Sequence, residues 1–466
     1  MTEGRDGARS NLVRRGLATI RGDAQLRRLL QDTSWLTGSN AIALALVLPQ
    51  GLLVARDLGV SGYGVFVLVT TFVTVADLLT SFRMNEFVVK YVAEALARDD
   101  RSSAAASWKV AMIGEASSAL VAFALVWLLA PLGARLFLKS ASDVRLIHLF
   151  AFIILANLVT ESTLGLLQAA GRFSLQAKLD TFGQGARTAA LVAVYVTSGR
   201  LEGYLLAWVG AQVIDSAAYL VAAALVAHRH LGPRWWATPL GVLRGKLGAM
   251  ARFGAFTNLS ASLKVINRTV DPLILGYFRS PAEAGYYRLA YSLVDLSFVP
   301  VGPITDVFYP EIARAAATAA WDDVRRLWRR GSNVVAAWTA PVTVALVAVA
   351  PFAIPLLLGR RYSHAITPLL LLLPGIAFAN ILFWARPSLL ALGFAGYATK
   401  VNAALTAAKL AASVALVPVL GPAGSAAILS LDLLFNIGLQ ARRAQRAVND
   451  REAAGATTLV GPTLPA

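Results

Sequence analysis

The sequence predicts an all-α, polytopic membrane protein with about twelve transmembrane helices, arranged as two parallel six-helix repeats around a central cavity. Three observations lead to this fold class. Long apolar runs recur along the chain, basic residues gather in alternate loops, and the two halves resemble each other. Hydrophobic residues make up 57% of the chain and charged residues 15%, against about 25% charged in a typical soluble domain. With a mean hydropathy of +0.61, the chain has no room for a large soluble domain.

Each apolar run is long enough to cross a bilayer as a helix, which needs about 20 residues. Two segments between runs, EFVVKYVAEALAR after the second and PEIARAAATAAWDDVRRLWRR after the eighth, are typical of helices that lie at the membrane surface. The spans are expected at residues 35–55, 62–82, 108–131, 145–168, 175–198, 203–227, 252–276, 285–308, 333–357, 366–391, 397–420 and 424–441.

These spans divide the chain into two lobes with polar segments around them. A segment rich in Gly, Thr and Pro at the C-terminal end is typical of disorder. The expected parts are a basic cytoplasmic tail at 1–33, a six-helix lobe at 34–228, a basic cytoplasmic connector at 229–251, a second six-helix lobe at 252–446 and a disordered cytoplasmic tail at 447–466.

Lysine and arginine residues are distributed unequally between the two sets of loops. Both tails and the loops after even-numbered spans hold most of them, for example Arg98, Arg244 and Arg329, whereas the opposite loops hold few. Because basic loops stay in the cytoplasm, both termini are expected to be cytoplasmic, in the inner membrane of a bacterium. The same rule accounts for the net charge of +17, so no nucleic-acid partner is expected.

Two residue types limit the chemistry further. The chain has no cysteine, which excludes disulfides and thiolate metal sites. Its four histidines form no cluster with metal-ligand spacing. We therefore expect neither a metal nor an organic cofactor, and the only small species expected is a coupling proton or sodium ion.

The two halves of the chain match at an offset of about 221 residues. Gly64 aligns with Gly285, and the segment AGRFSLQAKLD resembles LGFAGYATKVN further along each half. At nearly the same offset Arg187 aligns with Lys409. The period is six spans, an even number, so both halves enter the membrane from the same side. In transporters with such parallel repeats the substrate site lies between the halves, and their rocking alternates access to it.

Four segments in this order resemble the oligosaccharide flippases: ARDLGVSGYGVFVLVTTFVTVADLL, GYFRSPAEAGYYRLAYSLVDL, FYPEIAR and LLALGFAGYATKVNAAL. These flippases are the polysaccharide-export branch of the multidrug/oligosaccharidyl-lipid/polysaccharide exporter superfamily. The resemblance covers about residues 35–440. It implies two six-helix lobes flanking a cavity and the flipping of an undecaprenyl-pyrophosphate-linked glycan from the inner to the outer leaflet. The resemblance therefore implies as partners this lipid-linked anionic glycan, the lipid bilayer, and polysaccharide polymerase and assembly proteins.

A pyrophosphate-linked cargo needs cations inside the cavity, because Arg offers a fork of donors to phosphate oxygens and Lys a mobile point charge. Lys264, Arg268 and Asp271 share one helix face of the seventh span, at a depth where a charge costs about 2.5–3.5 kcal/mol. Two interpretations stay open: cargo contact, or an Arg268–Asp271 ion pair that braces the lobe. Once span ends are left out, the basic residues inside predicted spans, and hence the candidate substrate-binding residues, are Arg187, Lys264, Arg268, Arg288, Arg386 and Lys409.

Arg187 and Lys409 are repeat mates near the middle of the fifth and eleventh spans. They either face one anionic headgroup between the lobes or pair within their own lobes, Arg187 with Asp215 and Lys409 with Asp432. Arg386 lies in the inner half of the tenth span, where it either meets a pyrophosphate arriving from the cytoplasm or extends to the membrane surface.

Carboxylates inside spans are candidates for coupling transport to a proton or sodium gradient. Asp295 and Asp77 have no basic neighbour one helical turn away in the sequence, and Asp271 is a third candidate. Asp295 precedes Pro300 and Pro303, which remove helix hydrogen bonds and permit a bend.

Two other functions fit parts of the sequence. A cation-coupled multidrug antiporter of the same superfamily would use unpaired carboxylates rather than a basic cavity. A membrane glycosyltransferase or polymerase would need a large outer loop with catalytic acids, and the longest outer loop here spans only about residues 132–144. We therefore expect a transporter and not an enzyme.

Overall fold

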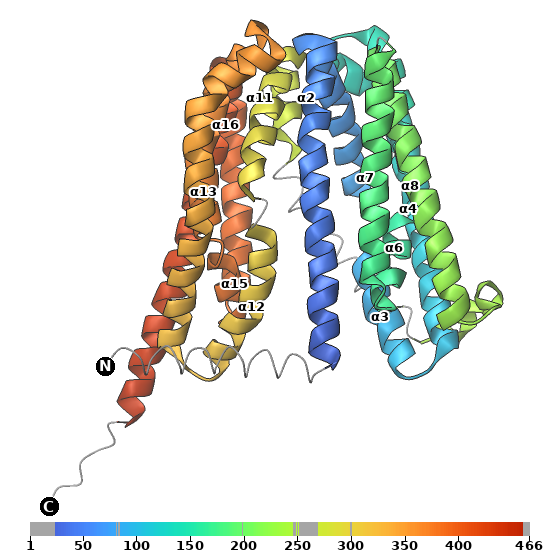
Figure 1. Ribbon diagram of the computed structural model, residues 1–466, viewed down its shortest axis with the longest axis vertical. Coiled ribbons are helices and arrows are strands. Elements are labelled where there is room, and N and C mark those ends of the chain that lie inside the picture. The colour runs from blue at the N-terminus through green and yellow to red at the C-terminus, as the bar shows by residue number, and fades with distance from the viewer. Residues whose placement is uncertain are drawn as a thin grey trace, which may run out of the picture.

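Long helices run between the two ends of the molecule in the computed structural model (Figure 1). The structure describes residues 24–459 apart from 81, 83, 198, 246, 247, 249, 251–268, 299 and 300, and these described residues contain no β-strand. The first turns of the helix α2 and the last turns of the helix α16 lie at the same end, which we call the termini end. The opposite end is called the far end.

The first lobe contains seven α-helices in its described residues, and one of them, α4, continues into a π-helical turn at Ala134–Leu138. The helices are α2 (Ala24–Thr80), α3 (Asn85–Ala97), α4 (Arg101–Gly133), α5 (Val144–Ala156), α6 (Thr160–Ala169), α7 (Phe173–Val196) and α8 (Leu201–His230).

The second lobe has the same kind of organisation. Short 3-10 turns lie at Leu296–Phe298 and Arg360–Ala365, between its longer helices. Its described helices are α10 (Asp271–Phe278), α11 (Pro281–Asp295), α12 (Val301–Ala317), α13 (Trp321–Leu358), α14 (Ile366–Ile381), α15 (Ala385–Ala391) and α16 (Ala395–Leu459).

Seven helical segments of the described residues are long and apolar enough to cross a membrane. Two of them, in α2 and α16, each contain two helices that meet at a glycine with non-helical angles, Gly59 and Gly421. The fifth expected span is α7, the eighth is divided between α11 and α12, and α10 is the described part of the seventh. The elements thus follow the expected order, and α3 occupies the surface segment expected after the second span.

The fourth and tenth spans are both broken, at corresponding places in the two lobes. In the first lobe α5 ends at Ala156 and α6 begins at Thr160, and in the second α14 ends at Ile381 and α15 begins at Ala385. The offset between the breaks is close to that of the sequence repeat. The two lobes therefore share this break in a helix as well as their matching sequence segments.

The lobes touch at the far end through the repeat mates Gly64 and Gly285. A Cβ on Gly64 would lie 1.9 Å from the carbonyl oxygen of Pro281, and a Cβ on Gly285 would lie 3.1 Å from Gly64 Cα. Glycine allows such a close approach of two helices because it has no side chain. Close by, the Tyr362 hydroxyl donates to the carbonyl of Ala55 at 2.5 Å, across the same lobe boundary.

The buried apolar residues form one shared core and two separate ones. The shared core includes Leu68 and Val69 of α2 together with Leu289 and Ala290 of α11. A second core lies within the first lobe, around Trp108 on α4, and a third within the second lobe, around the α13, α15 and α16 side chains. In Figure 1 the lobes converge at the far end and diverge towards the termini end, where each lobe has its own core.

Two local expectations differ from the structure. Residues 447–459, expected in a disordered tail, continue α16, and Ala447 and Val448 are buried against the second lobe. The segment from Pro281 to Gly285, expected as a loop, is the first turn of α11, because Ser280 accepts a hydrogen bond from the Glu283 N–H and Pro281 occupies the first helical position. For the C-terminal residues, the composition gave no indication of the face by which they pack against the second lobe.

A methyl group at Gly64 should weaken the contact between the lobes. We expect Gly64→Ala to destabilise the protein by about 1–3 kcal/mol through overpacking, seen as a lower midpoint of thermal unfolding in detergent. Gly210→Ala is the matched control, since no atom lies within 4 Å of the added Cβ on α8. Equal midpoints for the two variants would contradict the role of Gly64.

Candidate transport site

A buried ion pair connects two helices of the second lobe. Lys409 on α16 donates to Asp271 Oδ2 at 2.9 Å, and the exposed fractions of the two side chains are 0% and 1%. The Tyr287 hydroxyl of α11 donates to the same oxygen at 2.9 Å. Asp271 lies in the first turn of α10, where the helix dipole favours a negative charge. The pair thus joins α10, α11 and α16 inside the lobe.

The repeat mate of Lys409 lies in a network of amides. Arg187 on α7 donates to Gln212 Oε1 on α8 at 2.8 Å, and its guanidinium lies 5.1 Å from the centre of the Trp208 ring. Gln212 donates in turn to Asn157 Oδ1 at 2.9 Å, at the break between α5 and α6. The opposite charges of Arg187 and Asp215 also attract each other.

The structure thus places each of these two cations among groups of its own lobe. Arg187 hydrogen-bonds Gln212, and within the described residues it forms no ion pair with Asp215, so their predicted pairing stays a prediction. For Lys409 the buried salt bridge is with Asp271, a partner that the spacing of the sequence did not suggest. In this conformation a shared headgroup between Arg187 and Lys409 is not accommodated, because Lys409 is fully enclosed.

Arg386 and Arg288 are exposed. Arg386 lies in α15, directly after the break in the tenth span, and lines a cavity of about 380 Å³ with Thr305 and Tyr309 of α12. Figure 1 shows α12 and α15 on the side of the second lobe nearer α2, towards the termini end. Arg288 on α11 lies 5.9 Å from the Tyr291 ring, and an electrostatic interaction relates it to Tyr63 of the first lobe.

The remaining predicted residues fall in two groups. Asp77 and Asp295 are half-buried, Asp77 in the last turn of the second span and Asp295 at the C-terminal end of α11. Lys264 and Arg268 lie outside the described residues, so their predicted roles remain predictions. No three His, Asp or Glu side chains of the described chain form a group that could hold a metal ion.

Sequence reasoning missed Glu115, a buried carboxylate on α4. Its oxygens accept hydrogen bonds from the backbone N–H groups of Glu161 and Ser162, both at 2.8 Å, and from the Ser162 hydroxyl. These donors belong to the first turn of α6, so Glu115 caps the helix that follows the break in the fourth span. The sequence does contain a signal for Glu115, because it is a single acidic residue within a long apolar run. The carboxylates considered for coupling show the same pattern.

Residues 29–316 match the family described as polysaccharide biosynthesis protein. The chain belongs to this family. A relative from Escherichia coli (strain K12), the inner membrane protein YghQ, is 23% identical over 297 residues, which cover 63% of this chain and 82% of the relative.

Two solved structures share the fold. The lipid II flippase MurJ in an inward closed conformation has a TM-score of 0.71 at 12% identity, covering 88% of this chain and 87% of MurJ. An inward-facing multidrug resistance MATE family transporter of the MOP superfamily has a TM-score of 0.68 at 12% identity, covering 88% of this chain and 96% of that one. The prediction of an all-α polytopic fold is confirmed. The resemblance to proteins of polysaccharide export agrees with the family match. The apolar helices and the shared fold identify the chain as an integral membrane protein.

Removing either partner of the buried ion pair should leave a charge without compensation. We expect Asp271→Asn and Lys409→Met each to cost about 3–5 kcal/mol in stability, and the double variant to be less destabilised than the sum of the singles. Thermal unfolding of all four proteins measures the coupling, which should fall at about 0.5–3 kcal/mol for residues in contact. Additive effects would show that the two side chains do not interact in the folded protein.

Proposed function

We propose that the protein moves an anionic, lipid-linked oligosaccharide from the inner to the outer leaflet of the inner membrane by alternating access. The observation that carries this proposal is the family match over residues 29–316, which joins the chain to polysaccharide biosynthesis. The fold supports it, since MurJ, a lipid II flippase, has the same arrangement. With the basic termini in the cytoplasm, the diverging end of the lobes faces the inner leaflet, where such a cargo would be made.

Arg386 is the best-placed residue to meet the cargo. It is exposed in a cavity at the termini end, and its guanidinium can offer two parallel donors to a pyrophosphate. The nearby Tyr309 hydroxyl and Thr305 hydroxyl are neutral donors suited to the same oxygens or to the first sugar. Arg288, deeper on α11 and beside the lobe boundary, is a candidate second contact along the path.

The two enclosed cations have a different part in the proposal. Arg187 and Lys409 shape the interior of their lobes in this conformation and would contact cargo only after the lobes rearrange. Lys264 and Arg268 keep their predicted role as cargo contacts on the seventh span. Among the carboxylates, Asp271 is the coupling candidate with the most direct structural role, because it forms the buried ion pair with Lys409.

Transport of a labelled glycan tests the proposal. Full-length protein in proteoliposomes should move a polyprenyl-pyrophosphate oligosaccharide to the opposite leaflet, where an impermeant lectin detects it. Arg386→Ala should slow this movement about tenfold to a hundredfold, since a hydrogen bond to a charged group contributes about 1.5–3 kcal/mol, and Arg386→Lys should retain part of the rate. Arg330→Ala is the control, because Arg330 is exposed and does not line the Arg386 cavity.

The same vesicles separate the proposal from its main rival. If the wild-type protein leaves the glycan in place and instead exchanges an organic cation for protons, a multidrug antiporter is the correct function. The similarity of the fold to a MATE family transporter is the observation that favours this alternative. In that case Arg386→Ala should leave cation export unchanged, since a cationic drug gains nothing from a guanidinium in its path.

A further inference from the structure

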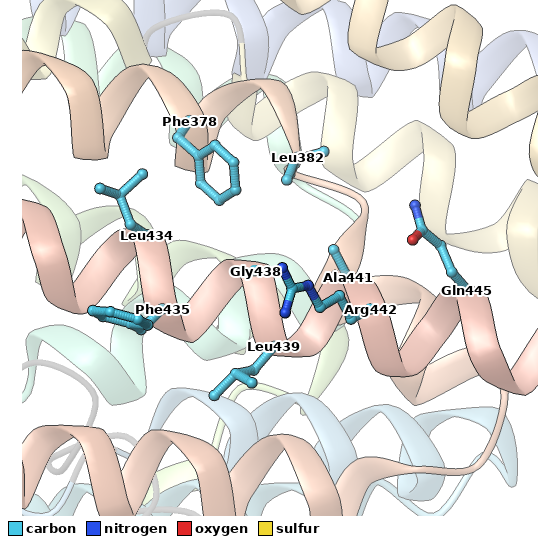
Figure 2. Close-up of a pocket in the computed structure, with 9 residues that line it drawn as sticks. All are labelled: Phe378, Leu382, Leu434, Phe435, Gly438, Leu439, Ala441, Arg442 and Gln445. Atoms are coloured by element: carbon cyan, nitrogen blue, oxygen red, sulfur yellow. The ribbon is translucent and has the colours of Figure 1, made fainter.

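A groove on the second lobe runs along α16 where it faces the end of α14. It has a volume of about 370 Å³ and is lined mainly by apolar side chains. Figure 2 shows Phe378 and Leu382 on one side, and Leu434, Phe435 and Leu439 of α16 on the other. Phe435 is 59% exposed and Leu439 39%. Gly438 contributes no side chain between them, which leaves the groove open along the helix.

One end of the groove is basic and polar. Arg442 and Gln445 continue the same face of α16, and Gln445 also lines a second cavity of about 380 Å³. That cavity contains Arg325 and Arg329 of α13 together with Asn449 of α16. The two hollows therefore adjoin at Gln445, and one continuous surface passes from apolar to cationic.

The charges at this end are unequally compensated. Arg325 pairs with Glu452 and donates to Asn449 Oδ1 at 3.0 Å. Within the part of the chain that the structure describes, neither Arg329 nor Arg442 forms an ion pair with a carboxylate. Both guanidinium groups are exposed, so two cations are available to a ligand on the same surface.

The wall of the polar cavity is rigid and aromatic. Trp328 and Trp384 stack at 4.5 Å between ring centres, with 15° between their planes. Their indole N–H groups donate to the Ser388 hydroxyl at 2.7 Å and the Ser332 hydroxyl at 2.8 Å. Both rings are buried, and the exposed arginines beside them lie where the apolar surface becomes cationic, as basic residues do at the cytoplasmic membrane–water boundary.

An apolar channel that ends in arginines at headgroup level matches an amphipathic molecule with a hydrocarbon chain and a phosphate. We propose that this groove binds one anionic phospholipid of the inner leaflet, with an acyl chain along α16 and its phosphate held by Arg329 and Arg442. Every lining residue of both hollows comes from the second lobe. A cargo path between the lobes would draw on both, which favours a resident lipid over the transported one.

Such a lipid would connect α13, α14 and α16 where the second lobe has its own small core. That core includes Trp328, Trp384, Ala441 and Ala444 and is separate from the core shared between the lobes. A bound lipid would therefore stabilise this half of the molecule without bridging to the other half. The inference goes beyond transport and does not require that the proposed cargo be correct.

Lipid binding by purified full-length protein tests the inference. After delipidation in detergent, phosphatidylglycerol should raise the thermal midpoint and be retained in native mass spectrometry, whereas phosphatidylcholine with the same acyl chains should be at least tenfold weaker. The Arg329→Gln/Arg442→Gln double variant should lose this preference. The Arg330→Gln/Arg446→Gln variant removes two exposed arginines that line neither hollow and should retain it.

A second variant keeps the test independent of folding. A Cβ at Gly438 would lie 3.9 Å from Phe378, an ordinary contact, so Gly438→Leu should fold while filling the groove, and it should lose phosphatidylglycerol retention. Retention by this variant or by the Arg329/Arg442 double variant would overturn the proposal, as would equal binding of the two lipids. Displacement by undecaprenyl phosphate at concentrations far below those of phosphatidylglycerol would reassign the groove to the cargo.

Discussion

The close contact between Gly64 and Gly285 sets the relation between the two lobes. Each glycine comes from the same position of its repeat. A Cβ on Gly64 would overlap the Pro281 carbonyl at the start of α11, and a Cβ on Gly285 would lie 3.1 Å from Gly64 Cα. This contact permits a single apolar core to extend across both lobes at the far end, while the termini end has a separate core in each lobe. The two outer cores each belong to one lobe, so a change in the angle between the lobes would leave them intact.

Within this symmetric frame the lobes satisfy their buried charges in different ways. The second lobe neutralises Lys409 with Asp271 in a fully enclosed salt bridge. The first lobe surrounds Arg187 with amides and an aromatic ring, and it caps the broken fourth span with Glu115. A buried ion pair is sensitive to the loss of either charge, whereas an amide network keeps its donors and acceptors at any pH.

Much of the fold could be predicted from sequence because membrane spans and repeats are recorded in local patterns. Apolar run length located the helices, and the alignment of Gly64 with Gly285 identified two positions that the structure brings together. The ion pair could not be predicted in the same way. Asp271 and Lys409 are far apart in the chain, and their contact depends on how α10 and α16 pack. Spacing along one helix suggests partners only within that helix, which is why Arg268 was the partner considered for Asp271.

The break in the fourth span escaped prediction for a related reason. No proline marks the break at Asn157, and the freed backbone groups are satisfied by Glu115 from another helix. The composition of the last residues likewise suggested disorder, while their packing against the second lobe makes them helical. In each case the deciding interaction is tertiary.

The cations of this protein fall into two groups, those compensated by other groups of the protein and those exposed to a ligand. A cation inside a membrane protein is stable only when a carboxylate, an amide or water compensates it. Lys409 and Arg187 meet that need within the protein. Arg386, Arg329 and Arg442 are exposed, at cavities of the second lobe. These arginines lie on two different surfaces, one on α15 beside α12 and one along α13 and α16. An anionic headgroup could thus occupy one surface while a second passes the other, and both surfaces belong to the lobe that holds the buried ion pair.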